Sequence, residues 1–200
     1  MSPRHGSTLS TDDPEPLLEV LQDLMESGPG IPAGETLELF LRATNRVRVS
    51  LPGSDSGEKM SRSSELGMAV RRFVQAEGKA GFATVNRCDS GHYLHALRGA
   101  DQDMATVDPG LAPAGPSDVQ TGSEPCLDLA EEPGQGESDL SLWLSEAVEH
   151  VEAAAGRITP IQVESGWAES GQTSEALVNS AGIRSGRRRF RTWAALQVVS

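Results

Sequence analysis

Hydrophobic residues recur at helical spacing in two separate segments of the chain. In DDPEPLLEVLQDLMESG they return every three or four positions, acidic residues occupy the first turn, and Gly28 follows as a stop signal. In SDLSLWLSEAVEHVEAAAGRI, Ser138 or Asp139 can cap the start and Gly156 ends the pattern. These patterns predict two main helices. The apolar stripe of the second helix contains Leu140, Trp143, Leu144, Ala147, Val148 and Val151.

Strict alternation of apolar and polar residues marks the predicted strands of the first half. ETLELFLRAT and NRVRVSL both alternate, and Asn45 between them fits a turn that separates two strands. LGMAVRRFVQAEGKAGFATVN predicts two strands joined by a tight turn at Glu77 and Gly78, because glycine tolerates the positive backbone angle that a short hairpin requires. DSGHYLHALRGA, with Asp89 or Ser90 as its cap, predicts a short helix.

The C-terminal segment predicts three further strands. They cover about residues 161–169, 174–179 and 187–199, and the turn-forming residues from Asn179 to Gly182 separate the last two. Together with the helices, these strands predict an α+β fold in which a mostly antiparallel sheet packs against two main helices.

A long acidic stretch interrupts the predicted elements. Residues 101–152 contain thirteen acidic residues and no lysine or arginine. Within this stretch, residues 106–136 are rich in Pro, Gly and Ser and lack periodicity, which predicts a long, acidic, mobile loop. Residues 1–12 are predicted to be a flexible tail, and residues 53–63 a flexible connector.

The composition restricts the classes of function. A formal net charge of -12 repels nucleic acid and anionic membranes at long range, so we expect neither as a general partner. Cys88 and Cys126 lie far apart and lack the CxxC spacing, which favours a reducing compartment over a disulfide framework. No segment resembles a signal peptide or a membrane span. We therefore expect a cytoplasmic protein.

A cluster of arginines stands out near the end of this acidic chain. On a strand, Arg187, Arg189 and Arg191 share one face, together with Trp193 and Ala195. The other face carries apolar residues, which is typical of a half-buried antiparallel strand. A nucleic-acid patch would need more aromatic residues or further basic segments, so we favour a sheet face. Glu164, Glu169 and Glu175 on neighbouring strands are the expected ion-pair partners.

The candidate catalytic and metal-binding motifs are incomplete. Cys88, His92 and His95 have a spacing that a zinc site can use, but tetrahedral zinc needs four ligands and no fourth is evident. Surface or half-buried histidines are the better interpretation. The GxSxG elbow of serine hydrolases is absent, and GSDSGEKMS misses the phosphate-loop pattern. We therefore assign no catalytic, cofactor-binding or metal-binding residue.

Four short motifs follow one another along the chain. NRVRVSL precedes the hairpin LGMAVRRFVQAEGKAGFATVN, and EHVEAAAGRI and ALVNSAGI come later. In this order they resemble the N-terminal domain of the TldD/PmbA family, which comprises zinc metallopeptidases also called modulators of DNA gyrase. The resemblance covers roughly residues 13–200. The matching positions are Gly67, Arg71, Gly78, Gly81, Phe82, Arg157, Ile158, Asn179, Ser180 and Gly182.

The resemblance implies a role in proteolysis. In that family an HExxxH helix and a later Cys bind zinc in a second, C-terminal domain, and two related subunits enclose a cavity where peptides or unfolded proteins are hydrolysed. The chain contains no HExxxH motif. It therefore resembles the N-terminal, non-catalytic part of such an enzyme, inactive alone, which contributes to dimerisation and to the substrate cavity and pairs with a TldD/PmbA-like subunit or a separate catalytic domain.

Two other interpretations stay open. The first is a stand-alone, non-enzymatic interaction module that binds a protein partner through an exposed strand edge or through the acidic loop. The second is direct modulation of gyrase or DNA, which rests only on the family's name and on the arginine cluster.

Overall fold

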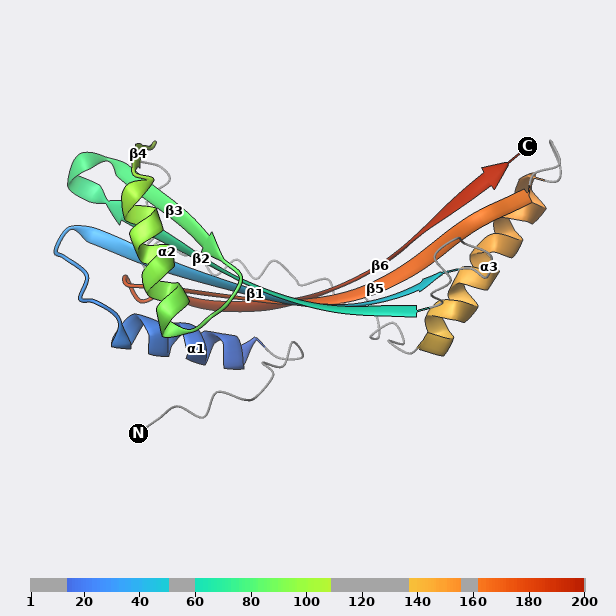
Figure 1. Ribbon diagram of the computed structural model, residues 1–200, viewed down its shortest axis with the longest axis horizontal. Helices are drawn as coiled ribbons and strands as arrows, with labels where there is room; N and C mark the ends of the chain where they lie inside the picture. The colour runs from blue at the N-terminus through green and yellow to red at the C-terminus, as the bar shows by residue number, and fades with distance from the viewer. Residues whose placement is uncertain (1–13, 51–59, 109–136, 156–161, 200) are drawn as a thin grey trace. The chain divides into compact units, whose positions relative to one another are not determined.

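The computed structural model describes residues 14–50, 60–108, 137–155 and 162–199 (Figure 1). The predicted flexible tail and most of the predicted acidic loop lie outside these residues. The elements are α1 (Glu15–Ser27), β1 (Glu35–Ser50), β2 (Met60–Val74), a 3-10 turn η1 (Gln75–Glu77), β3 (Lys79–Val85), α2 (Ser90–Gln102), β4 (Ala105–Thr106), α3 (Glu137–Ala155), β5 (Gln162–Asn179) and β6 (Arg184–Val199).

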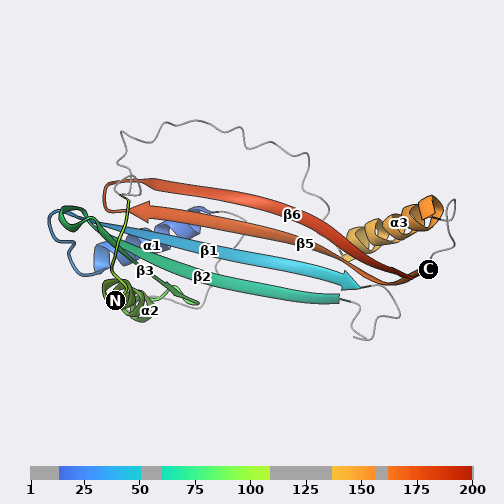
Figure 2. The same ribbon diagram turned by 90° about the horizontal axis from the view of Figure 1, so that it is seen from above.

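The strands form one six-stranded sheet. Their order is β4-β3-β2-β1-β5-β6, and Figure 2 shows β2, β1, β5 and β6 side by side. β2 pairs with β3, and β3 with β4, in antiparallel register. The predicted α+β class, with a sheet packed against helices, is confirmed. No helix in the described part of the chain is long and apolar enough to cross a membrane.

The predicted turn at Asn45 is wrong. β1 runs without a break from Glu35 to Ser50. The buried residues Leu37, Leu39 and Val49 all occupy odd-numbered positions, so one alternation continues through Asn45. A turn would have shifted that phase. Because β1 is flanked by β2 and β5, the polar residue continues the strand.

The predicted break between two strands in residues 170–173 is also wrong. β5 is a single strand from Gln162 to Asn179. Ser170, Gln172 and Ser174 are buried, and they continue the even-numbered positions that carry the buried Ala176. The segment reads as polar and turn-prone, but β5 lies between β1 and β6, and both neighbours favour an extended backbone.

The predicted hairpin is confirmed, with two differences in its limits. Val74 pairs with Lys79 across the turn, and Gly78 takes a positive φ of 59°. The turn also includes the short η1 segment. β2 begins at Met60, so residues 60–63 of the predicted connector belong to the strand. A two-residue strand, β4, follows α2 and takes up Thr106 from the start of the predicted loop.

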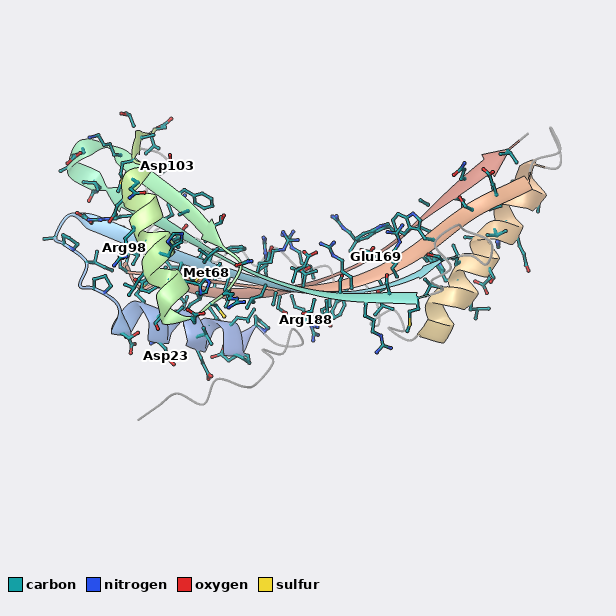
Figure 3. The ribbon with its side chains drawn as sticks, in the orientation of Figure 1. Asp23, Met68, Arg98, Asp103, Glu169 and Arg188 are labelled. Carbon is teal, nitrogen blue, oxygen red and sulfur yellow. The ribbon has the colours of Figure 1, made fainter. Side chains whose placement is uncertain are left out.

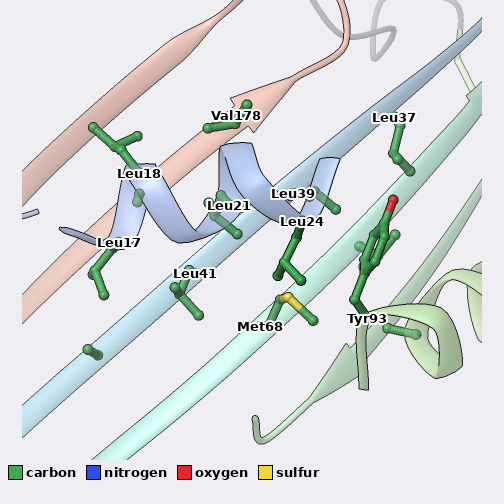
Figure 4. Packing of buried hydrophobic residues seen from close by; sticks show 14 of the residues in the cluster. Leu17, Leu18, Leu21, Leu24, Leu37, Leu39, Leu41, Met68, Tyr93 and Val178 are labelled. Atoms are coloured by element: carbon green, nitrogen blue, oxygen red, sulfur yellow. The ribbon is translucent and has the colours of Figure 1, made fainter. Parts of the chain in front are cut away.

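The structure divides into two compact units, each of which has its own core. The first contains residues 14–44, 65–108 and 173–189 of the described chain. Here α1 and α2 pack on one face of the strands, as Figure 4 shows for Leu21 and Tyr93. The odd positions of β1 face these helices. The core consists of Leu17, Leu18, Leu21, Leu24, Leu37, Leu39, Leu41, Ala43, Met68, Val70, Tyr93, Ala96, Ala100, Ala176 and Val178.

The predicted cap of α2 is confirmed. Asp89 is the N-cap residue, and its Oδ1 accepts a hydrogen bond from the backbone N–H of His92 at 3.0 Å. This bond and the one from the His92 ring hold the pKa of the Asp89 carboxyl below its usual value. The carboxylate therefore favours the helix start in its charged form.

We expect Asp89→Ala to lower the free energy of unfolding by about 1 kcal/mol, because the N-terminal amides of α2 lose their acceptor. Since the folded pKa is lowered, the carboxylate stabilises the fold above its unfolded pKa and loses this effect as the pH falls through the folded value. Urea unfolding at neutral and acidic pH should show the two proteins converging in acid. The exposed neighbour Ser90 provides a control: Ser90→Ala should change stability less at neutral pH.

The second unit is built around α3. It contains residues 45–50, 60–64, 137–155, 162–172 and 190–199 of the described chain. Its small core joins Leu144 of α3 to Val49 and Ala168, with Val47 and Leu196 packed against them. Helix α3 is confirmed, but it begins at Glu137, so the predicted caps Ser138 and Asp139 lie within the helix. Trp143, which was placed on its apolar stripe, is 41% exposed.

The predicted turn between β5 and β6 is confirmed. The Asn179 Oδ1 accepts hydrogen bonds from the backbone N–H groups of Ala181 and Ile183, at 3.1 and 2.9 Å. Gly182 has a φ of 94°, and its N–H donates to the Asn179 carbonyl oxygen. The turn needs an Asn side chain that accepts backbone N–H groups and a glycine that tolerates a positive φ, so the sequence predicts it.

Candidate functional site

The histidine and cysteine residues considered as metal ligands lie near the start of α2. The His92 Nδ1 is 2.8 Å from the Asp89 Oδ2, so the two side chains form a pair. Burial raises the pKa of the Cys88 thiol, and the Asp89 charge adds to this shift. The thiol is therefore a poor nucleophile at neutral pH.

His92 and His95 both border an open surface hollow between α2 and the hairpin. Its other lining residues come from β2, β3 and the segment after β3: Leu66, Gly67, Thr84, Val85 and Asn86. Among the described residues, no three His, Cys, Asp or Glu side chains lie close enough together to hold a metal ion. The hollow is therefore bordered by two imidazoles, and the described residues do not complete a set of three ligands around them.

A second cavity, of about 240 Å³, lies beside the charged cluster of Arg72. The Arg72 guanidinium contacts Glu35 at 2.6 Å and forms an ion pair with Asp101 of α2. The hydrogen bond to Glu35, opposed by burial and aided by Asp101, raises the pKa of Arg72 above its usual value. This cluster joins β1, β2 and α2, and its donors are engaged within the protein. Pro29, Gly30, Ile31, Pro32, Leu37 and Leu97 line the rest of the cavity.

The arginine cluster of β6 lies on a sheet strand, as predicted. The Arg187 Nε forms an ion pair with Glu175, one of the three predicted partners. Glu175 also lies 3.9 Å from the Arg42 Nε. Glu164 instead accepts a hydrogen bond from Gln197, at 2.7 Å. Glu169 lies 3.9 Å from the Arg46 Nε. Of the three expected carboxylates, Glu175 thus pairs with an arginine of the cluster.

Sequence reasoning missed a cluster of aromatic and basic residues in the second unit. The Arg48 guanidinium lies 4.0 Å from the centroid of the Trp167 ring, and the Trp167 and Trp193 rings are 6.4 Å apart. These residues come from β1, β5 and β6. The sequence shows the alternation of each strand, but this alternation does not reveal which strands are neighbours in the sheet.

No family model matches the chain, and no curated protein matches it. Solved structures do match. A protein described as a candidate modulator of DNA gyrase, from Bacteroides thetaiotaomicron, is 18% identical with a TM-score of 0.61, and the match covers 90% of this chain and 40% of that one. TldE from Thermococcus kodakarensis is 14% identical with a TM-score of 0.51 over 92% of this chain and 38% of that one. The chain has a TldD/PmbA-like fold.

This TldD/PmbA-like domain spans about two fifths of the length of the structures that it matches. Within it, the motif residues Gly67, Gly78 and Gly81 lie in the β2–β3 hairpin, and Asn179 lies in the turn before β6. The predicted match at residues 157–158 lies outside the described residues. The resemblance read from the motifs thus agrees with the fold.

Proposed function

We propose that this chain is the N-terminal, non-catalytic part of a TldD/PmbA-type metallopeptidase that hydrolyses peptides in the cytoplasm. In this role it contributes to dimerisation and to the substrate cavity. The observation that carries the proposal is the structural match over 90% of the chain to a candidate gyrase modulator. The similarity to TldE favours a partner subunit of the TldD/TldE type.

The described residues of this chain do not fit a zinc centre. The sequence contains no HExxxH motif, and the described residues bring no three potential ligands together. His92 is paired with Asp89, and Cys88 is half-buried with a raised pKa. We therefore assign no catalytic step to this chain, and the zinc and its ligands belong to a catalytic domain or subunit with which it assembles.

Isolation of the native assembly tests this proposal. We expect the tagged chain, expressed in its own cells, to co-purify with a polypeptide that carries HExxxH, and the complex to contain zinc. The complex should hydrolyse unstructured peptides and lose that activity with a chelator, whereas the chain alone should be inactive. Purification without such a polypeptide, or a complex that leaves peptides intact, would contradict the proposal.

One observation favours the alternative of a stand-alone interaction module. β6 is the last strand in the sheet order, so its outer edge has no neighbouring strand among the described residues. Val198 and Val199 near its end are each 45% exposed. An unpaired edge can add a strand from a partner. Co-purification with a partner that lacks HExxxH would favour this function; the predicted role of the acidic loop lies outside the described residues.

A further inference from the structure

The second unit presents a sheet face that α3 does not cover. Ala168 of β5 packs against Leu144 of α3, so the side chains next to it in sequence, Trp167 and Glu169, point to the opposite face. Figure 3 shows Glu169 on this side of β5. We call this surface the arginine–tryptophan face. Its charged and aromatic residues are Arg46, Arg48, Trp167, Glu169, Arg191 and Trp193.

The stacked arginine on this face is held in a defined orientation. The Arg48 guanidinium lies 4.0 Å from the Trp167 ring centroid, and Trp193 meets Trp167 edge to face at 79°. A guanidinium stacked on a ring keeps its N–H edge available to bind a carboxylate with two hydrogen bonds. Within the described chain, neither Arg48 nor Arg191 has a carboxylate at ion-pair distance.

The centre of the face contains a carboxylate that needs a donor. Glu169 is 8% exposed, and its Oε1 accepts no hydrogen bond from the described residues. The Arg46 Nε is 3.9 Å from this atom, which is beyond hydrogen-bond distance. The Oε1 atom is itself closed to solvent, so a ligand N–H group that donates to Glu169 binds the other carboxylate oxygen, Oε2.

We propose that the arginine–tryptophan face binds an extended acidic peptide that carries an aromatic side chain. Its carboxylates bind Arg48 and Arg191, a backbone N–H donates to Glu169, and its aromatic ring packs against Trp193. Arg46 and Glu169 offset each other's charge, so Arg48 and Arg191 make the face complementary to an acidic ligand.

A peptide fits this face better than single-stranded nucleic acid does. Nucleic acid also binds surfaces that combine cations with aromatic rings. However, a phosphate backbone that crosses the face would meet the Glu169 carboxylate and has no N–H group to donate to it. An extended peptide provides both the N–H donor and the carboxylates. The proposal concerns this chain alone and does not depend on a role in proteolysis.

Tryptophan fluorescence can measure this binding directly. The chain contains three tryptophans, and Trp143→Phe leaves Trp167 and Trp193 as the reporters. The probe is the acetylated, amidated peptide GEFEGEFEG, and the comparison ligands are its glutamine and lysine counterparts and a 12-nucleotide oligothymidylate. We expect saturable binding of the glutamate peptide, weaker binding of the glutamine peptide, and none of the lysine peptide.

Three variants separate this site from general charge attraction. Loss of a charge-assisted bond in Arg48→Gln should weaken binding roughly ten- to hundredfold. Arg62→Gln, at an exposed position of the same unit, should leave it unchanged. Glu169→Gln should also weaken binding, because a neutral amide is the poorer acceptor. If charge alone were responsible, removal of this negative charge would strengthen binding of an acidic peptide.

Several outcomes would overturn the proposal. These are absence of binding by the parent protein, tighter binding of oligothymidylate than of the glutamate peptide, equal losses in Arg48→Gln and Arg62→Gln, or tighter binding by Glu169→Gln. Circular dichroism identifies a variant that fails to fold. In that case Arg191→Gln, at an exposed position, replaces it and must weaken binding, since unchanged binding in that variant also contradicts the proposal.

Discussion

Gly81→Ala is expected to lower the free energy of unfolding by about 3 kcal/mol or more. A Cβ atom at this position would overlap the carbonyl oxygen of Ala100 in α2 and would lie 2.7 Å from its carbonyl carbon. Both are backbone atoms, so no side-chain rotation can relieve the clash. Helix α2 would have to move away from β3, and Tyr93, Ala96 and Ala100 would then lose contacts in the core.

Urea unfolding of Gly81→Ala and Gly67→Ala measures this effect with a matched control. Both glycines lie in the same hairpin, but the nearest atom to a Cβ at Gly67 is the Val85 carbonyl oxygen, at 4.0 Å. The substitution at Gly67 should therefore change stability by no more than about 1 kcal/mol, in either direction. Similar midpoints for the two variants would show that the contact between β3 and α2 does not require glycine.

Leu39→Ala is expected to cost about 2–5 kcal/mol of unfolding free energy. Leu39 is fully buried in β1, in the core that also contains Leu21 and Met68. Removal of its side chain leaves a cavity bordered by α1 and the neighbouring strand, and a strand in the middle of a sheet can move little to fill it.

Leu94→Ala is the control for this substitution. Leu94 belongs to the same unit but is 39% exposed on α2, so its truncation should cost less than half as much as that of Leu39. Denaturation in urea, followed by circular dichroism, compares the two variants. Comparable losses would mean that the buried face of β1 is not the principal core of the first unit.

The motif residues were readable because their requirements are local. Asn179 and Gly182 form the predicted turn through hydrogen bonds that span at most four residues, and Gly78 takes the predicted positive φ. Asp89 caps α2 for the same reason. The bonds that define a turn or a cap are made within the segment itself, so the identity of the residues decides them.

For the candidate sites, too, the sequence predicted the local spacing, and the structure decided which residues pair. The spacing of Cys88, His92 and His95 was visible in the sequence, and the structure shows that His92 pairs with Asp89 instead of completing a ligand set with them among the described residues. The pairing of Arg187 with Glu175 was one of three alternatives, because alternation gives the face of a residue but not its position opposite another strand.

Sequence by itself determined the helices, the hairpin, the turn before β6 and the family resemblance, since all of these depend on periodicity and local backbone preference. Only the tertiary structure decided the lengths of β1 and β5. A turn-prone residue such as Asn45 ends a strand or continues it according to the neighbouring strands, which supply its hydrogen-bond partners and are far away in sequence. The same reason explains the arginine–tryptophan face: Arg48, Trp167 and Trp193 meet because β5 lies between β1 and β6.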